Sequence, residues 1–284
     1  MESDILVFEP AGLRAGHERA SMRESESSAP SGGVRLEIDA GVAVVTIDRP
    51  HVRNAIGFAT IDELGVALDD VLASSAAVLV LRGGGDRAFV SGGDIKELGA
   101  IRTHEAAVDM ASRTRRLLDR VAAFPVPVIA ALNGHALGGG AEVAIAADIR
   151  VAADDVKIGF NQVTLGIMPA WGGAERLAQT IGRSRALLAI TTGDLYDAEA
   201  AERLGLFDVV VPRSEFDRQW RAIAQRLADS APGTTRAVKA VIAAAVPGVH
   251  PELEAAATDA FAGLWIGDAH WAAVDALEQK RRAG

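Results

Sequence analysis

Three consecutive glycines at residues 138–140 constrain this chain more than any other feature of its sequence. An apolar run that predicts a strand, residues 128–132, precedes them, and a segment that predicts a helix, residues 142–147, follows. Glycines at such a junction let the backbone approach a ligand closely and leave the first N–H groups of the helix without partners. Glu142 stands in the first helical turn beside those donors. Donors for a developing oxyanion next to an acid–base group favour enolate chemistry on a carbonyl or thioester.

Other interpretations compete for the same glycines. A dinucleotide-binding fingerprint would need glycine where Val143 stands, and the Gly-Lys-Ser/Thr of a P-loop is missing. When this motif is considered alone, a tight turn that serves packing and carries no chemistry remains an alternative interpretation. A second glycine site, residues 91–94, also follows a strand and a turn, and it favours the chemical interpretation. If the amides of both sites face one point, a carbonyl oxygen receives two backbone donors, which would carry much of the catalysis.

The composition of the 284 residues excludes several classes of protein. The net charge of −9 argues against nucleic acid as the main partner, because no basic stripe matches a phosphate backbone. The chain has no cysteine, which excludes disulfides, thiolate metal sites and cysteine nucleophiles and fits a cytoplasmic protein. No apolar run reaches the roughly 18 residues of a membrane span. The six histidines show no metal-ligand spacing, and His135, beside the glycines, is interpreted as structural.

Patterning along the chain predicts an α/β fold with a helical C-terminal region. Residues 1–33 are polar and are expected to form a disordered lead-in. From residue 34 onward predicted strands alternate with helices, and beyond residue 166 the pattern is largely helical. The predicted strands are residues 42–47, 78–81, 128–132, 149–152 and 156–160, and the predicted helices are residues 61–72, 106–123, 176–181, 186–191, 198–204, 216–230, 234–245 and 252–282.

Four motifs, taken in order, resemble those of the enoyl-CoA hydratase/isomerase, or crotonase, superfamily. They are Arg49-Pro50 with Arg53-Asn54-Ala55, the run at residues 88–97, the run at residues 133–142, and residues 165–169 with Gly172-Gly173. The similarity extends over about residues 34–284. It implies a ClpP/crotonase spiral of ββα units in a single domain. It also implies homotrimers, or homohexamers built from two trimers, that meet through C-terminal helices from about residue 215.

The resemblance also assigns roles to individual residues. Gly93 and Gly139 would donate the two oxyanion-hole N–H groups to a thioester oxygen, with Glu142 as the acid–base group. The implied contacts with the acyl-CoA substrate are Arg53 at the phosphates of coenzyme A, Asp94, Ile95 and Lys96 near its adenine, and Ala55 and Trp171. Coenzyme A enters as part of the substrate, and no metal or further cofactor is implied.

One position departs from the pattern of the superfamily. Its hydratases use two glutamates, one at the position of Glu142 and a second at a position that holds Gln162 here. An amide neither takes nor gives a proton near neutral pH, although it can form hydrogen bonds. Addition of water needs one group to activate the water and one to protonate the α-carbon. Gln162 therefore stands among the catalytic positions, but hydration by two carboxylates is closed to this chain unless another residue substitutes.

Decarboxylation avoids this difficulty. Loss of carbon dioxide from a malonyl-type thioester creates the enolate without a base, and one later proton donor suffices. Trp171 and Trp265 resemble the ethylmalonyl-CoA decarboxylase branch more than ordinary hydratases, although core packing explains either tryptophan equally well. The sequence thus predicts an acyl-CoA lyase that decarboxylates a methylmalonyl- or ethylmalonyl-CoA-like substrate. Two alternatives stay open: a 2-enoyl-CoA hydratase that works with one glutamate, and a non-catalytic acyl-CoA-binding protein.

Overall fold

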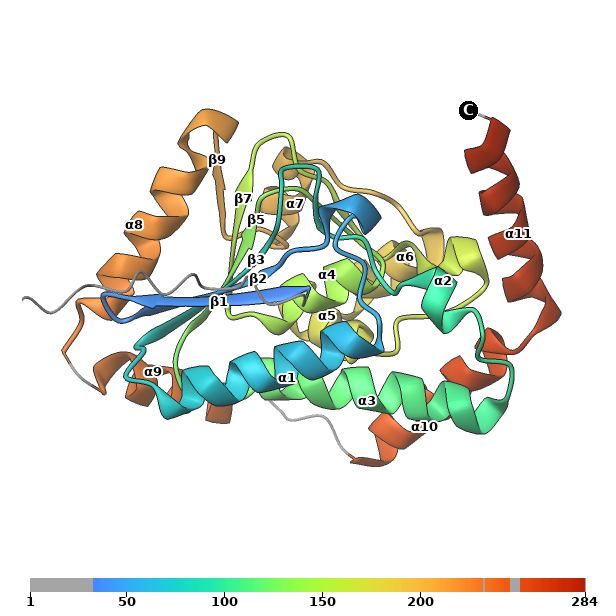
Figure 1. The fold of residues 1–284 in the computed structure, drawn as a ribbon, viewed down its shortest axis with the longest axis horizontal. Helices are drawn as coiled ribbons and strands as arrows, with labels where there is room; N and C mark the ends of the chain where they lie inside the picture. Colours follow the sequence, from blue (N-terminus) through green and yellow to red (C-terminus); the bar gives the residue numbers. More distant parts are fainter. Residues whose placement is uncertain (1–32, 232, 246–250, 284) are drawn as a thin grey trace, which may run out of the picture. The chain divides into compact units, whose positions relative to one another are not determined.

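The structure is a computed structural model that describes residues 33–231, 233–245 and 251–283. Two β-sheets form the framework of this part of the chain (Figure 1). The larger sheet has the strand order β1-β2-β3-β5-β7-β9, in which β1 pairs antiparallel with β2 and the other neighbours are parallel. Its strands are β1 (Val34–Asp39), β2 (Val42–Ile47), β3 (Val78–Gly83), β5 (Val128–Leu132), β7 (Ile149–Ala153) and β9 (Val209–Val211). The predicted disordered lead-in lies, except for Gly33, outside the described residues.

The first hairpin and the central strands follow from local sequence. β1 and β2 pair from Val34 opposite Ile47 to Asp39 opposite Val42, which leaves Ala40-Gly41 as the turn. Both turn residues have positive φ, 45° and 80°, the conformation that matches the twist of a two-residue hairpin. The apolar runs in β3 and β5 are buried throughout, apart from half-buried Arg82. Continuous apolar runs are typical of parallel strands that are covered on both faces.

A smaller parallel sheet joins β4 (Ala88–Val90), β6 (His135–Leu137) and β8 (Ile158–Gly159) in that order. The strand predicted at residues 156–160 is reduced to β8, and β4 and β6 are too short for periodicity to reveal. β4 and β6 are parallel neighbours, with Val90 opposite Ala136. The two glycine sites follow these strands directly. They therefore leave the same edge of one sheet, although more than forty residues separate them in the sequence.

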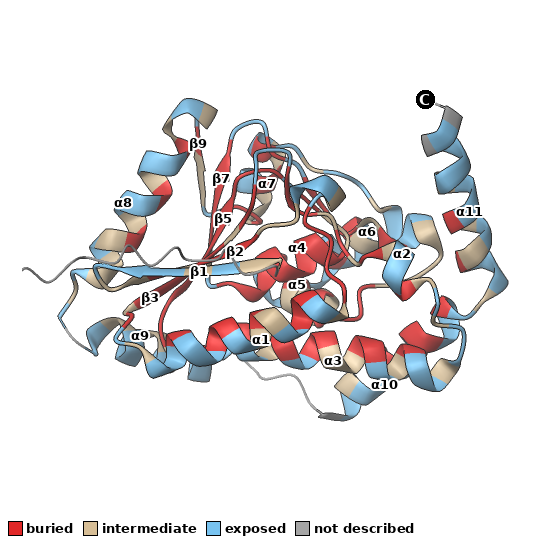
Figure 2. Ribbon diagram, viewed as in Figure 1, coloured by how far each residue is buried: buried red, intermediate tan, exposed pale blue. Residues whose placement is uncertain are grey.

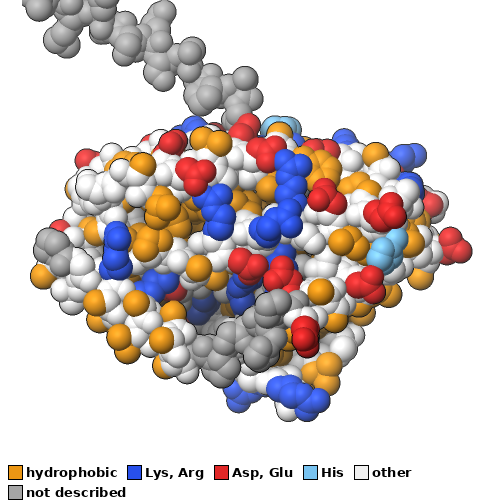
Figure 3. All heavy atoms as spheres, turned by 90° about the horizontal axis from the view of Figure 1, so that it is seen from below, with side chains coloured by type: hydrophobic (Ala, Val, Ile, Leu, Met, Phe, Trp, Pro, Cys, Tyr) orange, Lys and Arg blue, Asp and Glu red, His pale blue; other side chains and the backbone are white. Residues whose placement is uncertain are grey.

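Three helices lie side by side below the strands in Figure 1: α1 (Phe58–Ala73), α3 (His104–Ala122) and α10 (Pro251–Trp265). Ion pairs tie α3 to α1, because Arg113 pairs with Asp62 and Arg120 pairs with Asp69. The face drawn in Figure 3 shows basic, acidic and apolar side chains interspersed. No continuous basic stripe appears on that face.

The single helix predicted at residues 252–282 is wrong, because the chain forms α10 and then α11 (Asp268–Ala283). The break lies at Gly267, whose N–H donates to the carbonyl of Leu264 and whose own carbonyl accepts from the N–H of His270. This change of direction brings α11 into contact with η2 (Asn161–Leu165). Within the described ranges, no helix combines the length and apolarity that a membrane crossing requires.

The buried residues concentrate on the strands and on α4 (Gly139–Ala146), as Figure 2 shows. All eight residues of α4 are buried, including one carboxylate, Glu142. The other helical elements are η1 (Pro50–Val52), α2 (Ile95–Leu98), α5 (Gly173–Ile181), α6 (Arg183–Thr192), α7 (Ala198–Leu204), η3 (Arg213–Glu215), α8 (Phe216–Ala228) and α9 (Thr234–Ala245). A charged side chain in the middle of the core needs an explanation, since carboxylates are rarely buried without partners.

Candidate active site

A cavity of about 940 Å³ opens where the two glycine sites face α10 and α11. Its lining includes four kinds of group: backbone of the glycine sites, two polar side chains beside them, aromatic side chains, and charged residues. The backbone of the glycine sites is that of Gly93 and Gly139, and the two polar side chains are those of Glu142 and Gln162. The aromatic side chains include Trp171, Phe261 and Trp265, and the charged residues include Arg53 and Arg213. The cavity therefore gathers residues from the whole length of the described chain.

The helix at the triple glycine begins earlier than predicted. It starts at Gly139 and ends at Ala146, whereas the sequence pattern placed it at residues 142–147. The pattern missed the first turn because glycine carries no helix signal of its own. Gly138, just before the helix, has φ 56° and ψ −119°, a conformation open to glycine. The N–H of Gly139 thus belongs to the first turn, where intrahelical acceptors are lacking.

Two backbone amides are free to bind a ligand. Among the described residues, the N–H groups of Gly93 and Gly139 have no hydrogen-bond acceptor. The peptides flanking Gly93 bond to Ile56 at 2.8 Å each, which fixes the loop. A Cβ placed on Gly92 would lie 3.5 Å from the nitrogen of Gly139, so the two glycine segments adjoin. The predicted meeting of two amide donors is therefore geometrically available.

The ring of Trp171 covers both segments. A Cβ on Gly139 would lie 2.2 Å from Cζ3 of this ring, and a Cβ on Gly93 would lie 3.8 Å from its Cη2. Only glycine fits at position 139 while Trp171 keeps its place. Trp171 is buried and also lines the cavity. Its position is therefore compatible both with core packing and with the predicted substrate contact.

Glu142 is held by three donors. Its Oε1 accepts from Nε2 of Gln162 at 2.9 Å, and its Oε2 accepts from the N–H groups of Trp171 at 2.7 Å and Gly173 at 2.9 Å. Burial raises the pKa of Glu142 to about 7, although the two amides and the charge of Arg176 lower it. A carboxyl group with this pKa exists in both protonation states near neutral pH. It can therefore either accept or donate a proton.

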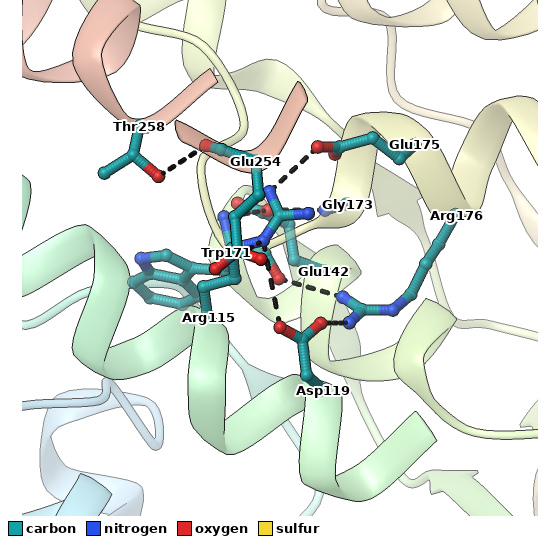
Figure 4. Close-up of polar contacts among 9 residues, drawn as sticks. All are labelled: Arg115, Asp119, Glu142, Trp171, Gly173, Glu175, Arg176, Glu254 and Thr258. Atoms are coloured by element: carbon teal, nitrogen blue, oxygen red, sulfur yellow. Dashed lines mark hydrogen bonds and ion pairs between the residues drawn. The ribbon is translucent and has the colours of Figure 1, made fainter. Parts of the chain in front are cut away.

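A network of charged side chains lies around Glu142 (Figure 4). Arg176 donates from Nη1 to the carbonyl of Trp171 at 2.9 Å and pairs with Asp119. Arg115, with 2% of its side chain exposed, donates to Glu175 at 2.8 Å. The network fixes the segment whose amides hold Glu142. Arg176 was not among the predicted site residues, because nothing in the glycine motif before it indicates which backbone carbonyl the guanidinium reaches.

The predicted coenzyme A contacts divide between two neighbouring cavities. Exposed Arg53 and half-buried Ile95 line the large cavity and also a second one of about 520 Å³. Ala55, Asp94 and Lys96 line only the second. Asp94 is buried and pairs with Arg49 at 3.0 Å, so its carboxylate is already engaged.

In the described part of the chain, no group of three or more His, Asp or Glu side chains has an arrangement that could hold a metal ion. His135 is exposed, and its Nδ1 accepts from the N–H of Lys157 at 3.1 Å. Burial of part of its ring lowers the pKa of His135. His270, which was not among the predicted site residues, is buried and lines the cavity with Phe261 and Trp265.

The strand–helix units, the parallel sheets and the helical C-terminal region define a crotonase-like fold. The family model for enoyl-CoA hydratase/isomerase matches residues 37–266. A short-chain-enoyl-CoA hydratase of Clostridium acetobutylicum is 36% identical over 74% of this chain and 80% of its own length. A crotonyl-CoA hydratase of Syntrophomonas wolfei is 33% identical over 87% of this chain and 95% of its own.

A solved structure of an enoyl-CoA hydratase from Mycobacterium avium subsp. paratuberculosis superposes with a TM-score of 0.78 at 25% identity, covering 86% of this chain and 98% of that one. The chain belongs to the enoyl-CoA hydratase/isomerase family. These similarities confirm the predicted crotonase-like fold and an enzyme of the lyase kind.

Proposed function

We propose that this enzyme acts on acyl-CoA thioesters through a thioester enolate, with Glu142 as its single proton carrier. One observation supports this most strongly: among the carboxylates that line the large cavity, Glu142 is the buried one, and that cavity also holds the free amides of Gly93 and Gly139. The cavity lining includes two further carboxylates, but Asp86 is exposed and Asp155 pairs with Arg213 at the surface. The site therefore offers oxyanion stabilisation and one proton, with no cofactor beyond the coenzyme A of the substrate.

These groups suffice for decarboxylation of a methylmalonyl- or ethylmalonyl-CoA-like substrate. The bond between the α-carbon and the carboxylate breaks, carbon dioxide leaves, and the electron pair forms the enolate. The enolate oxygen accepts hydrogen bonds from the amides of Gly93 and Gly139, which need no reorganisation. Protonated Glu142 then gives its proton to the α-carbon and is reprotonated from solvent. Its pKa of about 7 keeps a large fraction protonated at neutral pH.

Hydration of a 2-enoyl-CoA is the second candidate, and the names of the relatives favour it. Glu142 would take a proton from a water molecule while the oxygen of that water adds to the β-carbon. Glu142 would then donate this proton to the α-carbon. Gln162 could hold the water through its amide but could not share the proton transfer. A non-catalytic acyl-CoA-binding protein is disfavoured, because binding alone gives no reason to bury a carboxylate beside the two amides.

Side-by-side turnover of methylmalonyl-CoA and crotonyl-CoA tests the proposal, with the change Gln162→Glu as the decisive variant. The wild type should decarboxylate methylmalonyl-CoA and hydrate crotonyl-CoA poorly. Gln162→Glu should raise hydration by about 10–100-fold, since it supplies the second titratable group. It should lower decarboxylation, because a new buried anion repels the substrate carboxylate.

Val163→Glu provides the matched control, since Val163 is exposed on the same η2 turn and does not line the cavity. It adds the same charge and should change neither activity by more than about twofold. If the wild type hydrates crotonyl-CoA efficiently, the decarboxylase proposal is wrong and the hydratase alternative takes its place. No turnover of either substrate would contradict the acyl-CoA lyase proposal as a whole.

We also propose the trimeric or hexameric assembly through C-terminal helices that the resemblance implies. Helix α9 supports it with three exposed apolar side chains, Val238, Val241 and Ile242, which are 53%, 72% and 61% exposed. Apolar groups in such a row typically mark a contact surface. Light scattering of the purified protein should give three or six times the mass of 29.6 kDa.

A further inference from the structure

The side-chain amide of Asn161 is free and open to the large cavity. Asn161 is the first residue of η2, is half-buried and lines this cavity. Thr164 fixes its backbone by donating from Oγ1 to its carbonyl at 2.8 Å. In the described chain the side-chain amide has no hydrogen-bond partner, and neither of its polar atoms is buried. It therefore differs from the neighbouring Gln162, whose Oε1 is buried and out of reach of a ligand.

The amide of Asn161 lies in the corner of the cavity that holds the groups proposed for the reaction. A Cβ added to Gly138 would lie 3.5 Å from Oδ1 of Asn161 and 3.9 Å from Cδ of Gln162. Gly138 directly precedes Gly139, whose free amide is one of the two oxyanion donors. Gln162 in turn donates to Oε1 of Glu142 at 2.9 Å. A group bound to the amide of Asn161 is therefore close to the reacting carbons of a thioester.

A malonyl-type thioester brings a carboxylate into this corner, on its α-carbon. An anion that leaves water needs a hydrogen-bond donor, since burial without one is costly. The side-chain amide of Gln162 is already engaged with Glu142, whereas Nδ2 of Asn161 is unengaged. A neutral amide orients the carboxylate without the stronger ground-state hold of an ion pair, which would oppose the loss of carbon dioxide.

We infer that Nδ2 of Asn161 donates a hydrogen bond to the carboxylate of a malonyl-type thioester and so selects substrates that carry this group. The inference rests on the proposed function, because it takes the cavity as the site of a thioester that loses carbon dioxide. As the bond to the α-carbon breaks, negative charge moves from the carboxylate to the enolate oxygen at Gly93 and Gly139. The hydrogen bond from Asn161 therefore acts on binding and orientation of the substrate.

Calorimetric binding of 2-sulfopropionyl-CoA and propionyl-CoA tests this contact without turnover. The first carries a sulfonate in place of the carboxylate and cannot release carbon dioxide, and the second carries hydrogen there. Asn161→Ala should weaken binding of the sulfonate about 10-fold and binding of propionyl-CoA by less than about twofold, since one hydrogen bond to a charged group is lost. Asn161→Asp should weaken binding of the sulfonate about 100-fold, because it places an anion opposite an anion.

Val163→Ala is the matched control, since it truncates an exposed side chain on the same turn outside the cavity and should leave both affinities unchanged. Unchanged binding of the sulfonate in Asn161→Ala would overturn the inference by assigning the carboxylate to another donor. Equal losses for both thioesters would also overturn it, by giving Asn161 a structural role. In both cases decarboxylation of methylmalonyl-CoA by the wild type would leave the proposed function intact. If the wild type neither binds the sulfonate nor decarboxylates methylmalonyl-CoA, the proposed decarboxylation fails and the inference fails with it.

Discussion

The cavity has two walls whose polar atoms are satisfied in different ways. The glycine wall consists of residues 138–142 with the Trp171–Gly173 segment, and the aromatic wall consists of Phe261, Trp265 and His270. On the glycine wall both carboxylate oxygens of Glu142 accept hydrogen bonds, three in all. On the aromatic wall the indole of Trp265 reaches the carbonyl of Ile101 at 3.3 Å, and Nε2 of His270 has no partner in the described chain.

The difference separates two tasks. The glycine wall combines backbone amides, which donate, with the carboxylate of Glu142, which accepts hydrogen bonds from three donors. The positions of these groups are therefore set before substrate arrives, as stabilisation of a transition state requires. The aromatic wall comes from two helices near the C-terminus and lines the cavity with the side chains of Phe261, Trp265 and His270. We therefore propose that the reaction takes place at the glycine wall and that the acyl chain packs against the aromatic wall.

The largest effect should follow from Glu142→Gln, which keeps the shape of the side chain and removes proton transfer. We expect kcat to fall by about 10²–10⁴, measured by steady-state turnover of whichever acyl-CoA the wild type converts. Trp265→Phe, on the aromatic wall, is the matched control and should change kcat by less than about threefold. Comparable losses of kcat in both variants would contradict the proposed division of tasks between the two walls.

The buried carboxyl group should also make stability depend on pH. Glu142 has a pKa of about 7 in the folded chain against 4.5 as its ordinary value, so between these values the folded chain holds a proton that the unfolded chain has lost. The free energy of unfolding of the wild type should therefore fall as pH rises through this window, by about 3 kcal/mol relative to Glu142→Gln. Urea denaturation of both proteins at pH 5 and pH 8 measures it. A difference that stays constant with pH would show that the three donors outweigh burial.

A smaller effect is expected from Arg176, which acts through the Trp171 carbonyl and through its charge. Arg176→Leu should lower kcat about 10-fold and move the midpoint of the pH–rate profile upward from near 7, because the arginine charge lowers the pKa of Glu142. Arg176→Lys keeps the charge, so its midpoint should stay in place while kcat falls. If Arg176→Leu lowers kcat with an unmoved midpoint, the arginine serves packing alone.

Much of the fold was readable from periodicity. Strands β2, β3 and β5 and helices α1 and α3 carry apolar patterns long enough to identify, and the structure places them within a few residues of the predicted ranges. The strands β4 and β6 were missed because three residues cannot display a period. The break at Gly267 was missed because a single glycine inside a helical pattern usually costs stability without ending the helix.

The candidate site was readable only in part, for a related reason. The sequence points to Gly93, Gly139, Glu142 and Gln162, and the structure brings all four to one cavity. It also pairs Asp94 with Arg49 and places it in the lining of the second cavity, and its implied contact with coenzyme A stays a prediction. Arg176 and His270 stand in no motif, and their roles depend on which distant carbonyl each one reaches.

The sequence by itself determined which residue types occupy the key positions: glycine at a tight junction, a carboxylate in the first helical turn, and the amide of Gln162 about twenty residues later. These are properties of residue types and of their spacing, which act over a few positions. The tertiary structure decided that the two glycine sites leave one sheet edge, that burial raises the pKa of Glu142, and that His270 keeps a free acceptor. Each of these results depends on contacts between segments that are far apart in the sequence and that together exclude water. No local sequence pattern encodes that exclusion.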